Sequence, residues 1–66
     1  MKETTQISNI KEAIKKLLSR ESNLKVAAEH AISMRQYYTA SKHVAELQEL
    51  SIEIDEAYDT LRDLEA

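Results

Sequence analysis

Carboxylates at helical spacing are the first groups in this sequence that could do chemistry. Asp55, Asp59 and Asp63 recur every four residues, so in a helix they line one face on successive turns. Acid–base catalysis by paired carboxylates requires one of them to be desolvated in a cleft. Every Asp and Glu here falls on the polar side of its expected helix, so we expect no enzymatic activity. The stripe is interpreted as a docking surface for a basic partner, or as a solvated face.

Basic residues in the first third of the chain form a second candidate group. They are Lys11, Lys15, Lys16, Arg20 and Lys25. Such a cluster can contact the phosphate backbone of a nucleic acid. Alternatively, these are solvated side chains whose aliphatic stems cover the edges of the core. The acidic pI of about 5.3 weighs against nucleic-acid binding, which we keep as the rival hypothesis.

The aromatic pair Tyr37 and Tyr38, next to Arg35, is a third candidate. Tyr and Arg are enriched among the residues that dominate protein–protein binding energy. Adjacent helical residues point about 100° apart, so the two rings cannot be buried in the same face. We expect the exposed ring to contact a partner protein. The alternative is that one ring packs in the core and the other covers a turn.

Metal and cofactor sites are not expected. The sequence has no cysteine, which removes disulfides, thiolate ligands and thiol nucleophiles together. His30 and His43 lie too far apart in sequence for the closely paired ligands of a zinc site. The sequence has no glycine, so the usual phosphate-binding loops are absent. We therefore expect no metal, no cofactor and no small-molecule ligand.

The last third of the chain is the element around which the rest must be organised. Its apolar residues recur at helical spacing and form the expected core or oligomer face, Val44, Leu47, Leu50, Ile54, Tyr58, Leu61 and Leu64. The residues between them are mostly acidic, so this helix is apolar on one side and acidic on the other. Such a face must be covered, either by the N-terminal half of the chain or by a second molecule.

The absence of both glycine and proline predicts an all-α fold, because hairpin turns in sheets rely on such residues. We expect a small antiparallel bundle of three helices, at about residues 7–20, 24–34 and 37–64. Asn23 tolerates a left-handed cap and marks the first break. Ser33 followed by Gln36 has the form of a capping box and marks the second. The alternative is a two-helix hairpin with one long bent second helix.

A short resemblance also favours the second break. Tyr37, Ala40, Val44 and Leu47 resemble the second helix of a tetratricopeptide-like hairpin, over about fourteen residues. The chain lacks that family's glycine before the aromatic residue, its Trp-x-x-Leu-Gly motif, its closing proline and its repetition. The resemblance therefore implies only a turn immediately before Tyr37.

Length and charge together favour self-association. The chain is expected to form one domain, residues 1–66, with residues 1–6 frayed, and a core this small is marginal by itself. We expect a homodimer joined mainly through the last helix, with a monomer as the alternative. Residues 1–42 contain eight Lys or Arg and four Glu, whereas residues 43–66 contain one Arg and eight Asp or Glu. An antiparallel hairpin would place these halves side by side, within the chain or across a dimer.

The expected function is non-enzymatic. We expect a small regulatory or adaptor protein that associates with an unidentified protein through its helices, and that is encoded by a phage or mobile element. The rival is a nucleic-acid-binding regulator that uses the basic first helix, in the style of small RNA-binding helical hairpin dimers. No apolar run approaches the roughly 18 residues that span a bilayer, and no secretory signal is recognised. We therefore expect a cytoplasmic protein with no membrane contact.

Overall fold

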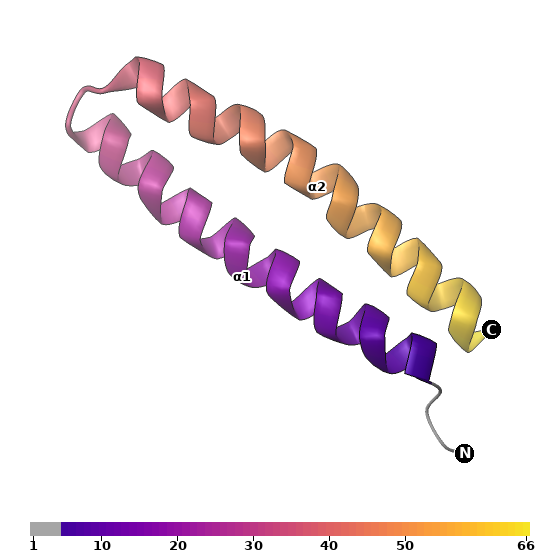
Figure 1. Ribbon diagram of the computed structural model, residues 1–66. Coiled ribbons are helices and arrows are strands. Elements are labelled where there is room, and N and C mark those ends of the chain that lie inside the picture. The colour runs from indigo at the N-terminus through magenta and orange to yellow at the C-terminus, as the bar shows by residue number, and fades with distance from the viewer. Residues whose placement is uncertain (1–4) are drawn as a thin grey trace.

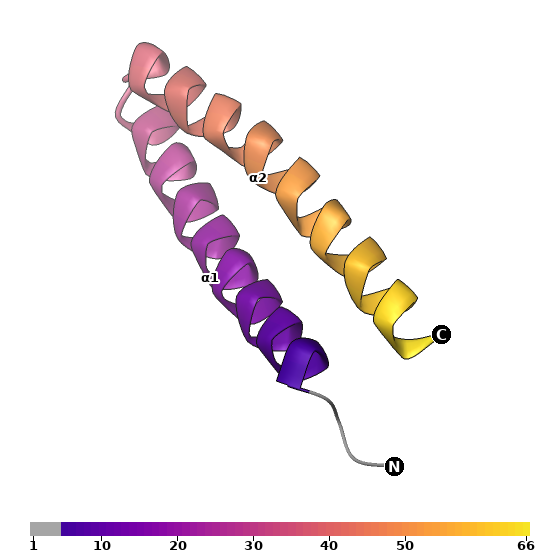
Figure 2. The same cartoon turned by 45° about the vertical axis from the view of Figure 1, so that its right-hand side comes forward.

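Two helices of equal length, joined by a short turn, make up the fold. The computed structural model describes residues 5–66, in which α1 spans Thr5–Ser33 and α2 spans Tyr37–Glu65, with 29 residues each. The helices run antiparallel, so the start of α1 and the end of α2 lie at one pole and the turn at the other (Figures 1 and 2). The molecule is a rod 51 Å long. The all-α prediction is confirmed, and the three-helix bundle is wrong.

The first predicted break does not exist, because residues 19–23 continue α1 without interruption. Ser22 and Asn23 are exposed on the outside of the helix, and their weak preference against helix is overridden by packing on either side. Leu17 and Leu24, seven residues apart, both face inward. The alternative, a two-helix hairpin, has the right number of helices. Its long second helix from about Asn23 is wrong, because the turn lies after Ser33 and the two helices are equally long.

The second predicted break is in the right place, but its mechanism differs. Ser33 Oγ donates to the carbonyl oxygen of His30, and no side chain caps the start of α2 at Gln36. Instead the backbone N–H of Gln36 donates to Ala31 O at 2.8 Å and that of Arg35 to Ile32 O at 3.0 Å. These two bonds form a Schellman motif, which ends α1. Its left-handed residue is usually glycine, and here it is Arg35, with φ of 61°.

The inward-facing residues of both helices follow one spacing. They come in pairs three apart, with four residues to the next pair, as in the heptads of a two-stranded coiled coil. In α1 the pairs are Ile7 and Ile10, Ile14 and Leu17, Glu21 and Leu24, and Ala28 and Ala31. In α2 they are Ala40 and His43, Leu47 and Leu50, Ile54 and Ala57, and Leu61 and Leu64. All sixteen are buried or half-buried, and Ala27 is the one further described residue that is not exposed.

The covered face of α2 is rotated from the one expected. Leu47, Leu50, Ile54, Leu61 and Leu64 face α1, as do Ala57 and His43. Val44 and Tyr58 lie at the edge instead, with 44% and 43% of their surface exposed. The covered face is therefore centred about one residue away from the expected one. Val44 and Tyr58 consequently lie at its edge and are only partly covered.

Two remaining expectations concern the chain start and the membrane. Of the six residues expected to be frayed, residues 1–4 lie outside the described part, and Thr5 and Gln6 belong to α1. Neither described helix is long and apolar enough to cross a bilayer.

Candidate interaction surfaces

Two ion pairs between the helices identify the two flanks of the hairpin. Lys11 Nζ lies 3.9 Å from Glu65 Oε2, and each of these residues directly follows an inward pair. Arg20 Nη2 lies 4.0 Å from Glu46 Oε2, and each of these directly precedes an inward pair. In an antiparallel helix pair, the residues that directly follow an inward pair lie on one side of the helix interface, and those that directly precede an inward pair lie on the other. The ion pairs therefore mark opposite sides of the molecule.

The flank marked by Lys11 and Glu65 is rich in large apolar side chains. The other residues that follow an inward pair are Leu18, Lys25, Ile32, Val44, Ser51 and Tyr58. We call the four large apolar ones the apolar flank: Leu18 is 39% exposed, Ile32 50%, Val44 44% and Tyr58 43%. They are half-covered by the hairpin itself, so part of each side chain remains in water. Sequence reasoning missed Leu18 and Ile32 as surface candidates and placed Val44 and Tyr58 on a core or oligomer face.

The residues of the opposite flank are polar or have small side chains. Its residues are Gln6, Ala13, Arg20, Ala27, Thr39, Glu46, Glu53 and Thr60. A small hollow of about 90 Å³ opens there and is lined by Arg20, Glu46, Glu49, Leu50 and Glu53. The Arg20 guanidinium itself supplies the positive charge among these carboxylates. This hollow is far below the size of a small-molecule site, which is on the order of 300–1,000 Å³. A second, more open hollow of about 330 Å³ lies nearer the chain ends and is lined by Gln6, Asn9, Ile10, Thr60 and Leu64.

A second surface lies at the turn, and we call Met34, Arg35, Tyr37 and Tyr38 the tip patch. Met34 is 58% exposed, Tyr37 62% and Tyr38 75%. Neither ring is buried, so the interpretation that places one of them in the core does not apply. Lys42 Nζ lies 4.8 Å from the centre of the Tyr38 ring, a cation–π contact within α2. The tip patch thus combines aromatic, apolar and cationic groups on one fixed turn.

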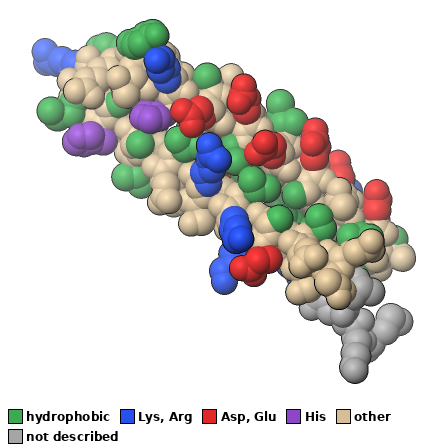
Figure 3. All heavy atoms as spheres, in the orientation of Figure 1, with side chains coloured by type: hydrophobic (Ala, Val, Ile, Leu, Met, Phe, Trp, Pro, Cys, Tyr) green, Lys and Arg blue, Asp and Glu red, His purple; other side chains and the backbone are tan. Residues whose placement is uncertain are grey.

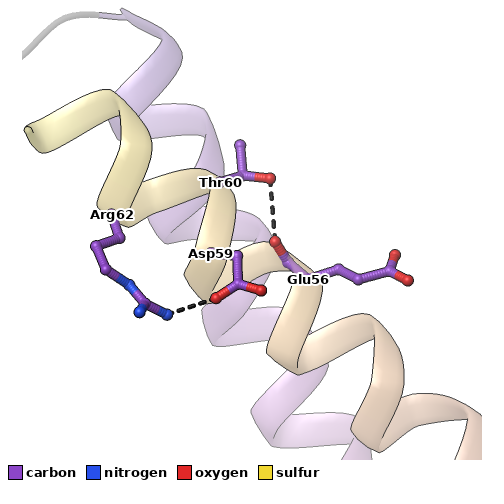
Figure 4. Close-up of polar contacts among 4 residues, drawn as sticks. All are labelled: Glu56, Asp59, Thr60 and Arg62. Atoms are coloured by element: carbon purple, nitrogen blue, oxygen red, sulfur yellow. Dashed lines mark hydrogen bonds and ion pairs between the residues drawn. The ribbon is translucent and has the colours of Figure 1, made fainter.

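The acidic stripe lies on α2, well away from the tip patch. Asp55, Asp59 and Asp63 are all exposed. Figure 4 shows Asp59 paired with Arg62, while the Thr60 hydroxyl donates to the backbone carbonyl of Glu56. Some 21 residues separate Tyr38 from Asp59, which is roughly 30 Å along a helix. The structure therefore does not join the stripe and the tip patch into one contact surface.

The basic cluster is distributed around α1 rather than gathered on one face. Lys11 and Lys25 lie on the side of the apolar flank, Arg20 lies on the polar flank, and Lys15 and Lys16 point outward. Lys25 Nζ is 3.9 Å from Glu21 Oε1, so three of the five cations take part in ion pairs. Most Asp and Glu side chains on the visible face gather over α2, whereas Lys and Arg lie over α1 and near the turn (Figure 3).

Two polar residues occupy inward positions that sequence reasoning did not include in the core face. Glu21 is inward-facing with its side chain 28% exposed, beside Lys25. His43 is half-buried in α2, and its Nδ1 atom is buried without a hydrogen-bond partner. Within residues 5–66, no three His, Asp or Glu side chains converge as a metal site would require. The position within the three–four spacing is the signal that would have placed both residues.

Comparison with family models, with curated proteins and with solved structures finds no match. The functional argument therefore depends on the two apolar surfaces of the hairpin. Of the nine large apolar side chains that are exposed within residues 5–66, four lie on the apolar flank and three on the tip patch. The other two, Val26 and Ile52, stand alone on the outer sides of α1 and α2. Such isolated residues are ordinary, whereas grouped ones mark binding surfaces.

Proposed function

We propose that this chain is a non-enzymatic adaptor or regulatory protein that binds a partner protein through its tip patch. The observation that carries the proposal is the exposure of Met34, Tyr37 and Tyr38, at 58%, 62% and 75%, on a single turn. Large apolar side chains that face water on a small domain lower its solubility, and a binding role accounts for their presence.

The chemistry of these groups suits protein recognition. Tyrosine offers a large contact area with few rotatable bonds, and its hydroxyl still bonds to polar groups. Arg35 adds a charged donor beside the rings. Because the two Schellman bonds fix the backbone at residues 35 and 36, the backbone that carries these side chains loses less entropy on binding.

Comparative capture tests the proposal. The wild-type chain, a Tyr37→Ser/Tyr38→Ser variant and an Ile52→Ser control are used as bait in extracts of the source cells. Ile52 is 60% exposed, so the control removes exposed apolar surface away from the turn. We expect one or more proteins to be retained by the wild type and the control and lost from the double variant. Identical retention by all three baits would contradict the tip patch as the contact.

The nucleic-acid alternative is examined with the same protein. Binding through Lys15, Lys16 and their neighbours requires retention on nucleic acid at low salt and a steep loss as salt rises, because counterions are released on binding. We expect no retention, since three cations of the cluster are engaged by Glu21, Glu46 and Glu65. Salt-sensitive retention that disappears in a Lys15→Ala/Lys16→Ala variant would favour the alternative instead.

A further inference from the structure

The apolar flank is a second surface, and its layout shows what covers it. The ion pair between Lys11 and Glu65 places these two residues at one level of the hairpin. One heptad further toward the turn brings Leu18 level with Tyr58, because seven residues advance both helices by about 10 Å. The following levels hold Lys25 with Ser51 and then Ile32 with Val44. Apolar and polar levels therefore alternate along this flank.

From this alternation we infer that two copies of the chain associate through their apolar flanks into a four-helix assembly, with both turns at the same end. The inference rests on the proposed function, in that both treat the chain as an association module, and it adds self-association through a different surface. Tyr37 precedes Val44 by one heptad, so the tip patch borders the turn end of this contact, while Tyr38, the next residue, points away from it.

Charge selects this arrangement over the other possible one. Within the described helices, α1 carries five Lys or Arg and three Glu, while α2 carries two Lys or Arg and eight Asp or Glu. When the two-fold axis runs parallel to the helices, the basic α1 of each copy lies beside the acidic α2 of the other. When the axis runs across the helices, α1 lies beside α1 and α2 beside α2. The first arrangement pairs opposite charges, and the second pairs like charges, which is unfavourable.

The order of levels points to the same arrangement. With the axis parallel to the helices, each level meets its own copy: Leu18 and Tyr58 meet Leu18 and Tyr58, and Ile32 and Val44 meet Ile32 and Val44. The Lys11 and Glu65 level also meets itself, so each Lys11 gains a second carboxylate nearby. A surface that is complementary to itself in this way is what a two-fold symmetric dimer requires.

Mass and concentration dependence test the association. Sedimentation equilibrium of the wild-type chain is expected to give twice the 7.6 kDa mass of one chain, with a thermal midpoint that rises with protein concentration. Tyr58→Glu, and on the other helix Ile32→Glu, are expected to give the single-chain mass while circular dichroism still reports helix. Ile52→Glu adds the same charge on the outer side of α2 and is expected to leave the dimer intact.

A wild-type chain that remains at 7.6 kDa into the millimolar range would overturn the inference. So would a flank variant that stays dimeric. If one flank variant is unfolded, the mass of the other variant and the mass of the wild type still test the association. A monomeric wild type that still captures its partner through the tip patch would refute self-association alone.

A distance between the two turns tests the orientation. The sequence has no cysteine, so Arg35→Cys provides a single attachment point for a spin label on each copy. Turns at the same end are expected to give a label-to-label distance well below the 51 Å length of the rod. A distance close to that length would place the turns at opposite ends and overturn the arrangement.

Discussion

The half of the helix interface near the turn differs from the half near the chain ends. Toward the turn, the inward residues include Ala28, Ala31 and Ala40, which are only 2–5% exposed. Toward the ends, large aliphatic residues such as Ile14 and Ile54 face inward, at 5% and 7% exposure. Small side chains exclude water by letting the helices approach closely, whereas large ones contribute apolar area. The two halves should therefore respond oppositely to a change in side-chain size.

A buried charge is expected to have the largest effect, because it should unfold both halves of the helix interface. Ile54→Asp places a carboxylate where the side chain is 7% exposed, and no cation is available inward to pair with it. Uncompensated burial of a charge costs several kcal/mol, about the whole stability of a domain this small. Circular dichroism is expected to show loss of helix at 25 °C. We expect the same of Leu47→Asp, and unchanged melting of both would contradict the assigned interface.

Changes of size test the comparison directly. Ile14→Ala, near the chain ends, is expected to destabilise by about 2–5 kcal/mol, because it removes apolar area and leaves a cavity. Ala31→Leu, near the turn, is expected to destabilise by about 1–3 kcal/mol, because the helices must move apart to admit the larger side chain. Urea denaturation measures both. Val26→Ala, at a site 64% exposed, is the control and should change little. A stabilising Ala31→Leu would show that the turn half is not closely packed.

Replacing the unpartnered histidine sharpens the contrast within the turn half. His43→Leu keeps a similar volume and removes a buried nitrogen that has no hydrogen-bond partner. A buried unsatisfied polar atom costs about 1–3 kcal/mol, so the variant is expected to be more stable by about 1 kcal/mol or more. Thermal denaturation at fixed protein concentration measures the difference. A loss of stability would indicate that the ring contributes packing that leucine cannot replace.

The acidic exterior of α2 is expected to matter least. Glu53→Ala and Asp55→Ala change exposed carboxylates, and each is expected to alter the free energy of unfolding by less than about 0.5 kcal/mol. The same denaturation measurement applies to both. A large loss from either variant would mean that the outer charges, and not only the interface, hold the helices together.

Sequence reasoning located the second helix closely. The predicted 37–64 compares with the observed Tyr37–Glu65, because the apolar spacing is regular through this segment and changes phase before it. The all-α class also followed from composition, since a chain without glycine or proline has few ways to make sheet turns.

The features that sequence reasoning missed are polar residues in apolar positions. Glu21 interrupts the inward stripe of α1 close to Asn23, which was taken to mark the first break. His43 occupies an inward position of α2, whereas the expected face passed through the neighbouring Val44. Arg35 gave no signal either, because its left-handed backbone is imposed by the closure of α1 and not by its own preference. The way residues group into the apolar flank and the tip patch depends on these positions. The kinds of exposed residue were therefore predictable from the sequence, but their grouping into surfaces was not.

The hairpin connection has a consequence for anything attached to the chain. Because the start of α1 and the end of α2 share one pole, a domain fused at either point is carried on a rigid spacer, up to 51 Å from the tyrosines. Fusion tags at the ends should leave partner recognition undisturbed. In the proposed dimer, both tip patches would lie at one pole and the four free helix ends at the other. The dimer could then connect proteins bound at the tip patches to domains fused at the helix ends.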